Sequence, residues 1–154
     1  MTKIKEIGHA VLHVSNVATS SDWYCDILGM EVVIESASFP ARFLSFGRKD
    51  HDLALFQSAD IAGHGGREYN HLAFEIDGSL EDLKRFRRRL VHKGVTITGT
   101  VDHGISYGIY FLDPDGHQLE VFQQRTGPAE DAKAVFRDVG ILARPIDLES
   151  TNEQ

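Results

Sequence analysis

Residues 8–15, GHAVLHVS, share a pattern with residues 70–77, NHLAFEID. In each stretch a His is the second residue, and the side chains that follow alternate in the manner of a β-strand. Each stretch leads into a segment with helical spacing, then a glycine, and then three stretches rich in β-branched and aromatic residues. The repeat therefore predicts two βαβββ modules in succession.

The two helices of the repeat are expected at about residues 16–28 and 79–93. Both segments place apolar residues at helical spacing and are bounded by residues typical of helix ends. The first helix is expected to begin after Ser15 or Asn16 and to end at Gly29. The second is expected to begin after Ser79, with Asp82 three positions further on, and to end at Gly94.

These elements predict an α+β fold, in which the two modules form a curved, cup-like mixed sheet with the helices on the outside. Module 1 covers about residues 4–58 and module 2 about residues 69–124, joined by a Gly-rich linker at 59–68. Together they make a single domain over residues 1–124. Residues 125–154 are expected to form a tail that is partly helical or disordered.

Composition narrows the classes of function. The formal net charge of −7 argues against a nucleic-acid partner, because phosphate binding favours a basic surface. No apolar run approaches the roughly 20 residues that span a bilayer, and the N-terminus lacks the apolar core of a signal peptide, so no membrane partner is expected. The single cysteine, Cys25, excludes an internal disulfide and fits a cytoplasmic location. Eight histidines make metal or acid–base chemistry worth testing.

Three residues stand out as metal ligands. His9 and His71 occupy equivalent places in the two repeats, on strand faces that are not wholly apolar. Glu120 lies in the apolar strand QLEVF, where an unpaired carboxylate would be costly unless a cation supplied its counter-charge. Two imidazoles and one carboxylate leave adjacent positions open on a metal, as in non-haem Fe(II) oxygenases. Taken singly, each residue also fits a blander position: a core or half-exposed histidine, or a carboxylate on the wet face of an edge strand.

The paired modules, the strand-initial histidines and YFLDPDGHQLEVF (110–122) resemble the vicinal oxygen chelate superfamily. This superfamily includes glyoxalase I, fosfomycin- and bleomycin-resistance proteins and type I extradiol catechol dioxygenases, and the resemblance covers residues 4–124. The stretch DHGIS…IYFLDPDG is similar to an extradiol-dioxygenase segment, and that match implies catalytic roles beside the metal for His103 and Tyr110. HDLAL resembles the strand that bears the family's acid–base histidine, which implies that role for His51.

The lack of an acidic residue at one position of module 1 distinguishes between members of the superfamily. Aligning the hairpins of the two modules places Ala54 opposite Glu120. Members similar to glyoxalase I carry an acidic ligand at this position of the first module. This chain has Ala54 there, so the resemblance implies three protein ligands to the metal and not four. The match is therefore closest to the single-domain type I extradiol dioxygenases.

That resemblance implies an Fe(II) enzyme, with Mn(II) as the alternative metal. Its substrates would be O2 and a catechol-type aromatic diol, including a dihydroxybiphenyl-like one, in aromatic-hydrocarbon catabolism. It also implies a homodimer or higher homo-oligomer. Two alternatives stay open. One is another metal-dependent enzyme of the superfamily, namely a glyoxalase, an isomerase or a thiol transferase. The other is a metal-free binding protein of the bleomycin-resistance type.

Overall fold

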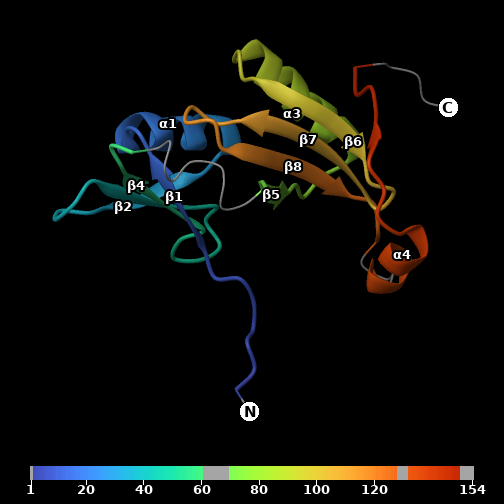
Figure 1. The fold of residues 1–154 in the computed structure, drawn as a ribbon, viewed down its shortest axis with the longest axis horizontal. Coiled ribbons are helices and arrows are strands. Elements are labelled where there is room, and N and C mark those ends of the chain that lie inside the picture. The colour runs from blue at the N-terminus through green and yellow to red at the C-terminus, as the bar shows by residue number, and fades with distance from the viewer. Residues whose placement is uncertain (1, 61–69, 128–131, 150–154) are drawn as a thin grey trace. The chain divides into compact units, whose positions relative to one another are not determined.

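The chain divides into two compact units, Met1–Glu68 and Tyr69–Gln154, and each holds one of the βαβββ repeats. The computed structural model describes residues 2–60, 70–127 and 132–149 (Figure 1). Most of the expected linker and the last residues of the tail lie outside these ranges.

The first unit contains one helix and a four-stranded sheet. Its strands follow the order β1-β4-β3-β2, with β1 parallel to β4 and the other neighbours antiparallel, so the sheet is mixed. Its elements are β1 (Ala10–Val14), α1 (Val17–Leu28), β2 (Glu31–Glu35), β3 (Ala41–Ser45) and β4 (Leu53–Gln57).

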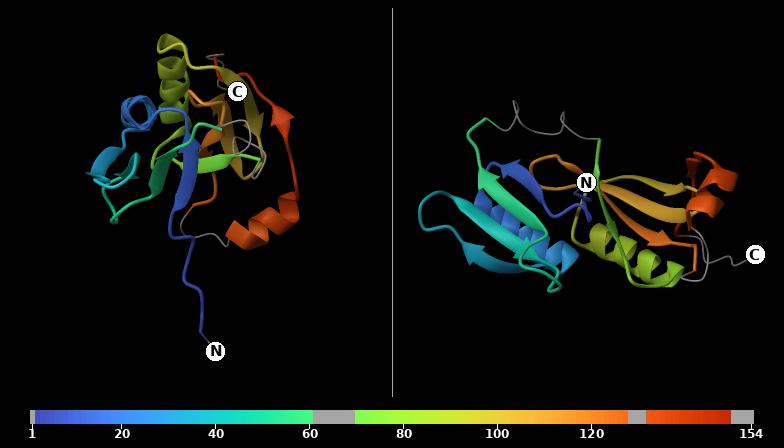
Figure 2. Two further views of the ribbon diagram at one scale, coloured as in Figure 1. Left: turned by 60° about the vertical axis from the view of Figure 1, so that its left-hand side comes forward. Right: turned by 90° about the horizontal axis from the view of Figure 1, so that it is seen from below.

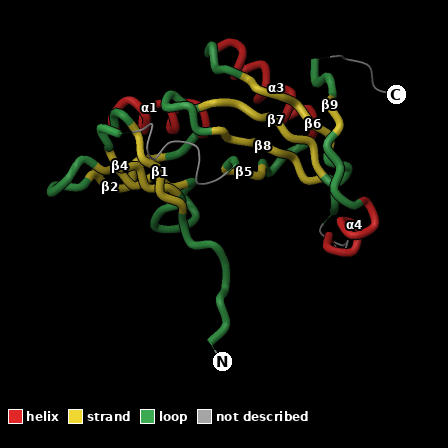
Figure 3. Tube along the Cα trace, viewed as in Figure 1, coloured by secondary structure: helices red, strands yellow, loops and turns green. Residues whose placement is uncertain are grey.

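The second unit repeats this plan and extends it. Its sheet order is β5-β8-β7-β6-β9, with β5 parallel to β8 (Figures 2 and 3). Helix α4 follows β8, and the short strand β9 then pairs with β6 at the sheet edge. The elements are β5 (Leu72–Glu75), α3 (Leu80–His92), β6 (Ile97–Asp102), β7 (Ser106–Leu112), β8 (Gln118–Gln124), α4 (Ala132–Val139) and β9 (Arg144–Pro145). The α+β class and the two βαβββ-like modules with mixed sheets are therefore confirmed.

Local sequence explains where the two repeat helices begin and end. The Asn16 side chain accepts a hydrogen bond from the amide at position 19, and α1 ends at Gly29, whose φ of 72° favours glycine. Ser79 and Asp82 form a reciprocal capping box at the start of α3. Within α3, Leu83 and Leu90 are both 0 % exposed and lie in the core of the second unit.

Strand alternation separates a core face from an outer face in each unit. In β1, Leu12 and Val14 are buried whereas Val11 is 48 % exposed. In the second unit, α3 packs on the sheet, and Phe86 meets Phe111 of β7 edge-on with ring centroids 5.8 Å apart. The alternation expected from the sequence of residues 8–15 is thus present in β1.

A search of the described helices finds none with the length and apolarity that crossing a membrane requires.

Candidate functional site

The second unit brings together a buried carboxylate and an imidazole. Glu120 lies on β8 between two core residues, and its side chain is only 7 % exposed. His71 directly precedes β5, the strand that runs parallel to β8, and its Nε2 lies 3.0 Å from Oε2 of Glu120. Two of the three ligands predicted from the sequence therefore face each other within one unit.

The orientation of the His71 ring is set by its neighbour in the chain. Nδ1 of His71 lies 2.9 Å from Oδ1 of Asn70. An amide oxygen only accepts, so Nδ1 donates and Nε2 is the nitrogen turned towards Glu120. Metal-binding histidines usually have such a partner on the second nitrogen, which fixes the tautomer.

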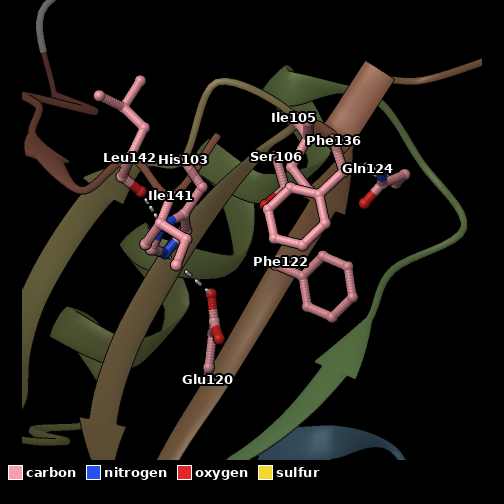
Figure 4. Close-up of a pocket in the computed structure, with 9 residues that line it drawn as sticks. All are labelled: His103, Ile105, Ser106, Glu120, Phe122, Gln124, Phe136, Ile141 and Leu142. Atoms are coloured by element: carbon pink, nitrogen blue, oxygen red, sulfur yellow. Dashed lines mark hydrogen bonds and ion pairs between the residues drawn. The ribbon is translucent and has the colours of Figure 1, made fainter. Parts of the chain in front are cut away.

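A second imidazole and a phenol also lie beside Glu120, and the ring of the phenol, Tyr110, lies edge-on to that of His71 with centroids 5.1 Å apart. Tyr110 of β7 pairs directly with Glu120 across the sheet. Nε2 of His103 lies 3.0 Å from the Tyr110 hydroxyl. The same atom lies 3.8 Å from Oε1 of Glu120 (Figure 4). Nδ1 of His103 donates to the carbonyl of Leu142 at 2.7 Å, so the neutral ring presents Nε2 as an acceptor.

The environment of Tyr110 keeps its phenol protonated. Burial, then the negative charge of Glu120 and a hydrogen bond with it, raise the pKa of Tyr110 to about 12. The hydroxyl carries one hydrogen, for which His103 and Glu120 compete. At neutral pH Tyr110 is therefore a hydrogen-bond donor and not a base.

A glycine makes room for the carboxylate. Gly108 of β7 is buried, and a Cβ built on it would overlap Oε1 of Glu120. Glycine within a strand often marks such a close approach. Neither Gly108 nor Asn70 was predicted as a site residue. The sequence signals that could have found them are a glycine inside the strand SYGIYFL and a polar residue directly before His71.

The pair formed by His71 and Glu120 fits a divalent metal. Ligand atoms at right angles around an ion with bonds of roughly 2.0–2.1 Å lie about 3 Å apart, which matches the 3.0 Å between Nε2 and Oε2. A buried carboxylate also needs a compensating charge. Within residues 2–60, 70–127 and 132–149, no set of three or more His, Cys, Asp or Glu side chains is placed to hold an ion. The structure thus brings together two of the three predicted ligands, His71 and Glu120, in the second unit.

The other predicted site residues lie together in the first unit. His9 precedes β1 as His71 precedes β5, and its ring lies 4.4 Å from that of His51 between centroids. Nδ1 of His51 contacts Oδ2 of Asp50 at 2.9 Å, and this hydrogen bond lowers the pKa of the Asp50 carboxyl. Each unit therefore holds part of the predicted set.

Strand register supports the equivalence of Ala54 and Glu120. Ala54 pairs with Val11 in the parallel β1–β4 ladder, as Glu120 pairs with Ala73 in the β5–β8 ladder. Across the antiparallel ladders, Ala54 faces Phe43 where Glu120 faces Tyr110. The first unit therefore has no carboxylate at the position where the second has its buried one.

A cavity of about 300 Å³ opens beside the site in the second unit (Figure 4). Its polar lining comes from His103, Ser106, Glu120 and Gln124. Its apolar lining comes from Ile105, Phe122, Phe136, Ile141 and Leu142. The last three of these follow β8 in the chain, so the expected tail supplies a wall of the cavity. The sequence prediction did not assign those residues to the site.

The known proteins that are similar to this chain include two enzymes and a fosfomycin resistance protein of known structure. Biphenyl-2,3-diol 1,2-dioxygenase 2 from Rhodococcus globerulus is 28 % identical over 151 residues, which cover 96 % of this chain and 78 % of that one. Metallothiol transferase FosB from Staphylococcus haemolyticus is 34 % identical over 139 residues, covering 88 % and 93 % of the two chains. The crystal structure of the fosfomycin resistance protein FosX from Listeria monocytogenes, complexed with Mn(II) and sulfate ion, aligns with a TM-score of 0.64. It is 22 % identical and covers 79 % of this chain and 92 % of that chain.

The family comparison covers most of the chain and both modules. Residues 6–121 match one family from before β1 to within β8. The matched stretch includes His9, His71 and Glu120 and ends before α4 and β9. This protein therefore belongs to the Glyoxalase/Bleomycin resistance protein/Dioxygenase superfamily.

Proposed function

We propose that this protein is an Fe(II)-dependent extradiol dioxygenase that cleaves a catechol-type aromatic ring, with Mn(II) as the alternative metal. The observation that carries the proposal is the contact of the buried Glu120 with both His71 and the His103–Tyr110 pair. Membership of the superfamily and its named relatives support the broader class, a metal-dependent enzyme.

In this proposal His71 and Glu120 hold the metal, and His9 is the third ligand because it is the repeat equivalent of His71. Ala54 offers no donor atom where the second module has Glu120, which leaves coordination positions open for a bidentate diol and O2. When bound, the metal would polarise the diol oxygens and O2.

The chain's own groups position the substrate and move its protons. The Leu142 carbonyl accepts from Nδ1 of His103, so Nε2 is the ring nitrogen left to accept the proton of a diol hydroxyl. Tyr110, with its pKa raised to about 12, donates to a substrate oxygen. His51 is the proposed proton donor later in the reaction, with Asp50 holding its ring.

The proposed reaction balances without an external reductant. One ring C–C bond next to the diol breaks, and both atoms of O2 enter the ring-opened product; the aromatic diol is oxidised and supplies all the electrons that reduce O2. The small aromatic diol and O2 are therefore the only substrates required. The resemblance to single-domain dioxygenases also leads us to propose a homodimer or higher homo-oligomer.

The test is anaerobic reconstitution with Fe(II), followed by air and each of catechol, 3-methylcatechol and 2,3-dihydroxybiphenyl. We expect a yellow ring-cleavage product from at least one of them, followed by its absorbance. Protein that retains iron and yields no product from any of the three would refute the proposal.

Two matched pairs of variants test the ligand assignment by metal content. Glu120→Gln should abolish iron retention, whereas Glu75→Gln removes an exposed carboxylate from the neighbouring strand β5 and should leave retention unchanged. His9→Ala should lower retention as His71→Ala does, while His13→Ala in β1 should not. Full retention in His9→Ala would remove His9 from the ligand set.

One alternative has a specific observation behind it. Of the two enzymes compared above, the metallothiol transferase FosB has a higher identity to this chain, 34 %, than the dioxygenase, 28 %. A thiol transferase, isomerase or glyoxalase activity would use the same metal without O2. The reconstituted protein would then bind metal but consume no O2 with any diol, and an oxygen electrode distinguishes the two classes. A metal-free binding protein would retain no metal at all.

A further inference from the structure

The chain after β8 folds back and becomes part of the second unit. We call residues 132–148, which comprise α4, β9 and the residues after them, the C-terminal wall. It is fastened by β9, which pairs with β6, and by a 2.6 Å hydrogen bond from the Thr100 hydroxyl to the Ile146 carbonyl. Leu148 is 5 % exposed and anchors its end in the core. The family match ends at residue 121, before the wall begins.

The wall leaves large apolar side chains uncovered on the cavity. Phe136 of α4 is 47 % exposed and Ile141 is 97 % exposed, yet both line the cavity that contains Glu120 (Figure 4). Phe122 and Ile105 continue this apolar surface from the sheet side. Contiguous exposed apolar surface with a polar rim marks a ligand site more often than chance placement. A ligand that reaches the metal pair therefore has an apolar surface beside it.

The size of the cavity limits what that ligand is. Its volume of about 300 Å³ is roughly twice the ~150 Å³ of an apolar cavity that holds one benzene. One aromatic ring at Glu120 and His103 would leave space for a second flat group. Aromatic rings such as those of Phe122 and Phe136 favour offset or edge contacts with another ring. A second ring fits this space better than a charged group, since none of the wall residues that line the cavity is charged.

The wall also contacts the catalytic side directly. The Leu142 carbonyl accepts from Nδ1 of His103 at 2.7 Å, and Leu142 lines the same cavity as Ile141. Gly104, with φ of 77°, lies under the wall, where a Cβ would overlap Val139. The wall is thus fitted closely to the turn that carries His103, so its apolar side chains keep a fixed position relative to the proposed reacting end.

We propose that the C-terminal wall is the specificity-determining element of this protein. Phe136 and Ile141 would receive the flat apolar group, such as a second aromatic ring, that the substrate carries beyond its reacting ring. This assignment of the reacting end rests on the proposed dioxygenase function, whereas the binding of the distal group does not.

Binding without metal tests the wall separately from the chemistry. Isothermal titration calorimetry of the metal-free full-length chain would compare 2-hydroxybiphenyl, which carries the second ring, with phenol, which lacks it. We expect tighter binding of 2-hydroxybiphenyl, and Phe136→Ala should weaken it about tenfold while leaving phenol unchanged. Arg137→Ala is the control: it truncates an exposed side chain of the same helix that does not line the cavity, and should change neither affinity. Circular dichroism would verify that both variants keep the fold.

Three results would overturn the proposal. The first is equal affinity of the parent protein for the two probes. The second is an affinity for 2-hydroxybiphenyl that is the same in Phe136→Ala as in the parent, and the third is an equal loss of affinity for both probes in Phe136→Ala. Wall-dependent binding of 2-hydroxybiphenyl in a protein that cleaves no diol would sink the proposed activity and leave the wall assignment standing. If Phe136→Ala cleaves the diols with the same preference as the parent, the wall assignment is wrong and the proposed activity stands.

Discussion

Replacing Asn70 with alanine removes the oxygen that accepts from Nδ1 of His71 at 2.9 Å. The imidazole then loses the contact that keeps its proton on Nδ1 and turns Nε2 towards Glu120. We expect the variant to bind Fe(II) or Mn(II) more weakly, because part of the His71 population adopts the other tautomer or another ring orientation.

The size of the effect follows from exposure. Losing a partner of a ligating histidine costs roughly 10–100-fold in metal affinity. Asn70 is exposed and the His71 side chain is 30 % exposed, so water replaces part of the lost contact. We therefore expect a loss of metal affinity at the lower end of this range, about tenfold, which corresponds to about 1.4 kcal/mol. That value lies within the net contribution of one hydrogen bond, about 0.5–1.5 kcal/mol.

The assay is an anaerobic competition titration with a chromophoric chelator near neutral pH. Asn70→Asp is the matched control, because it keeps an acceptor oxygen in place and adds a negative charge near the cation. It should bind the metal at least as tightly as the parent protein. If Asn70→Ala and the parent have the same affinity, while Glu120→Gln loses the metal, the role assigned to Asn70 is wrong.

Three further predictions concern neighbouring features. Gly108→Ala should displace the Glu120 carboxylate and cut metal retention while far-UV circular dichroism stays unchanged; normal retention would mean that the strand shifts to absorb the methyl group. Burial opposes the charge of His117, but its ion pair with Asp113 outweighs burial and raises the pKa of His117. The resulting stabilisation is complete below about pH 6.5 and is lost as pH rises through the raised pKa, so urea titrations should show the unfolding free energy falling over that window in the parent but not in His117→Gln. Ser79→Ala removes the N-cap of α3 and should lower the unfolding free energy by about 1 kcal/mol, and a change near zero would show that the capping box contributes nothing.

The elements that the sequence predicted well are those with local or periodic signals. The capping box at Ser79 and Asp82 is a pattern of residue types at fixed spacing, and α3 begins there. The equivalence of Ala54 and Glu120 came from aligning two hairpins, and the strand registers confirm it, because both strands pair in the same way within their modules.

Other features could not be predicted because their signals are not carried by residue type. Strand β9 spans two residues, Arg144–Pro145, which is too short for any alternation to be visible. The partner of His103 Nδ1 is the backbone carbonyl of Leu142, 39 residues away, and every residue has such a carbonyl. The role of the tail in the cavity thus depends on a long-range fold-back that sequence periodicity does not encode.

The attachment of the C-terminal wall has a consequence for how this protein can change. The wall joins the sheet at its edge strand β6 through two residue pairs, Val101–Pro145 and Asp102–Arg144. In the proposed function the ligands from the second unit are His71 and Glu120, and both precede the wall in the chain. The proposed specificity element therefore follows the proposed metal ligands in the sequence, and the hydrogen bond from Nδ1 of His103 to the Leu142 carbonyl connects the two. Exchanging the final segment for that of a relative would be a route to a new substrate range in one step, provided that the new segment keeps an acceptor for Nδ1 of His103.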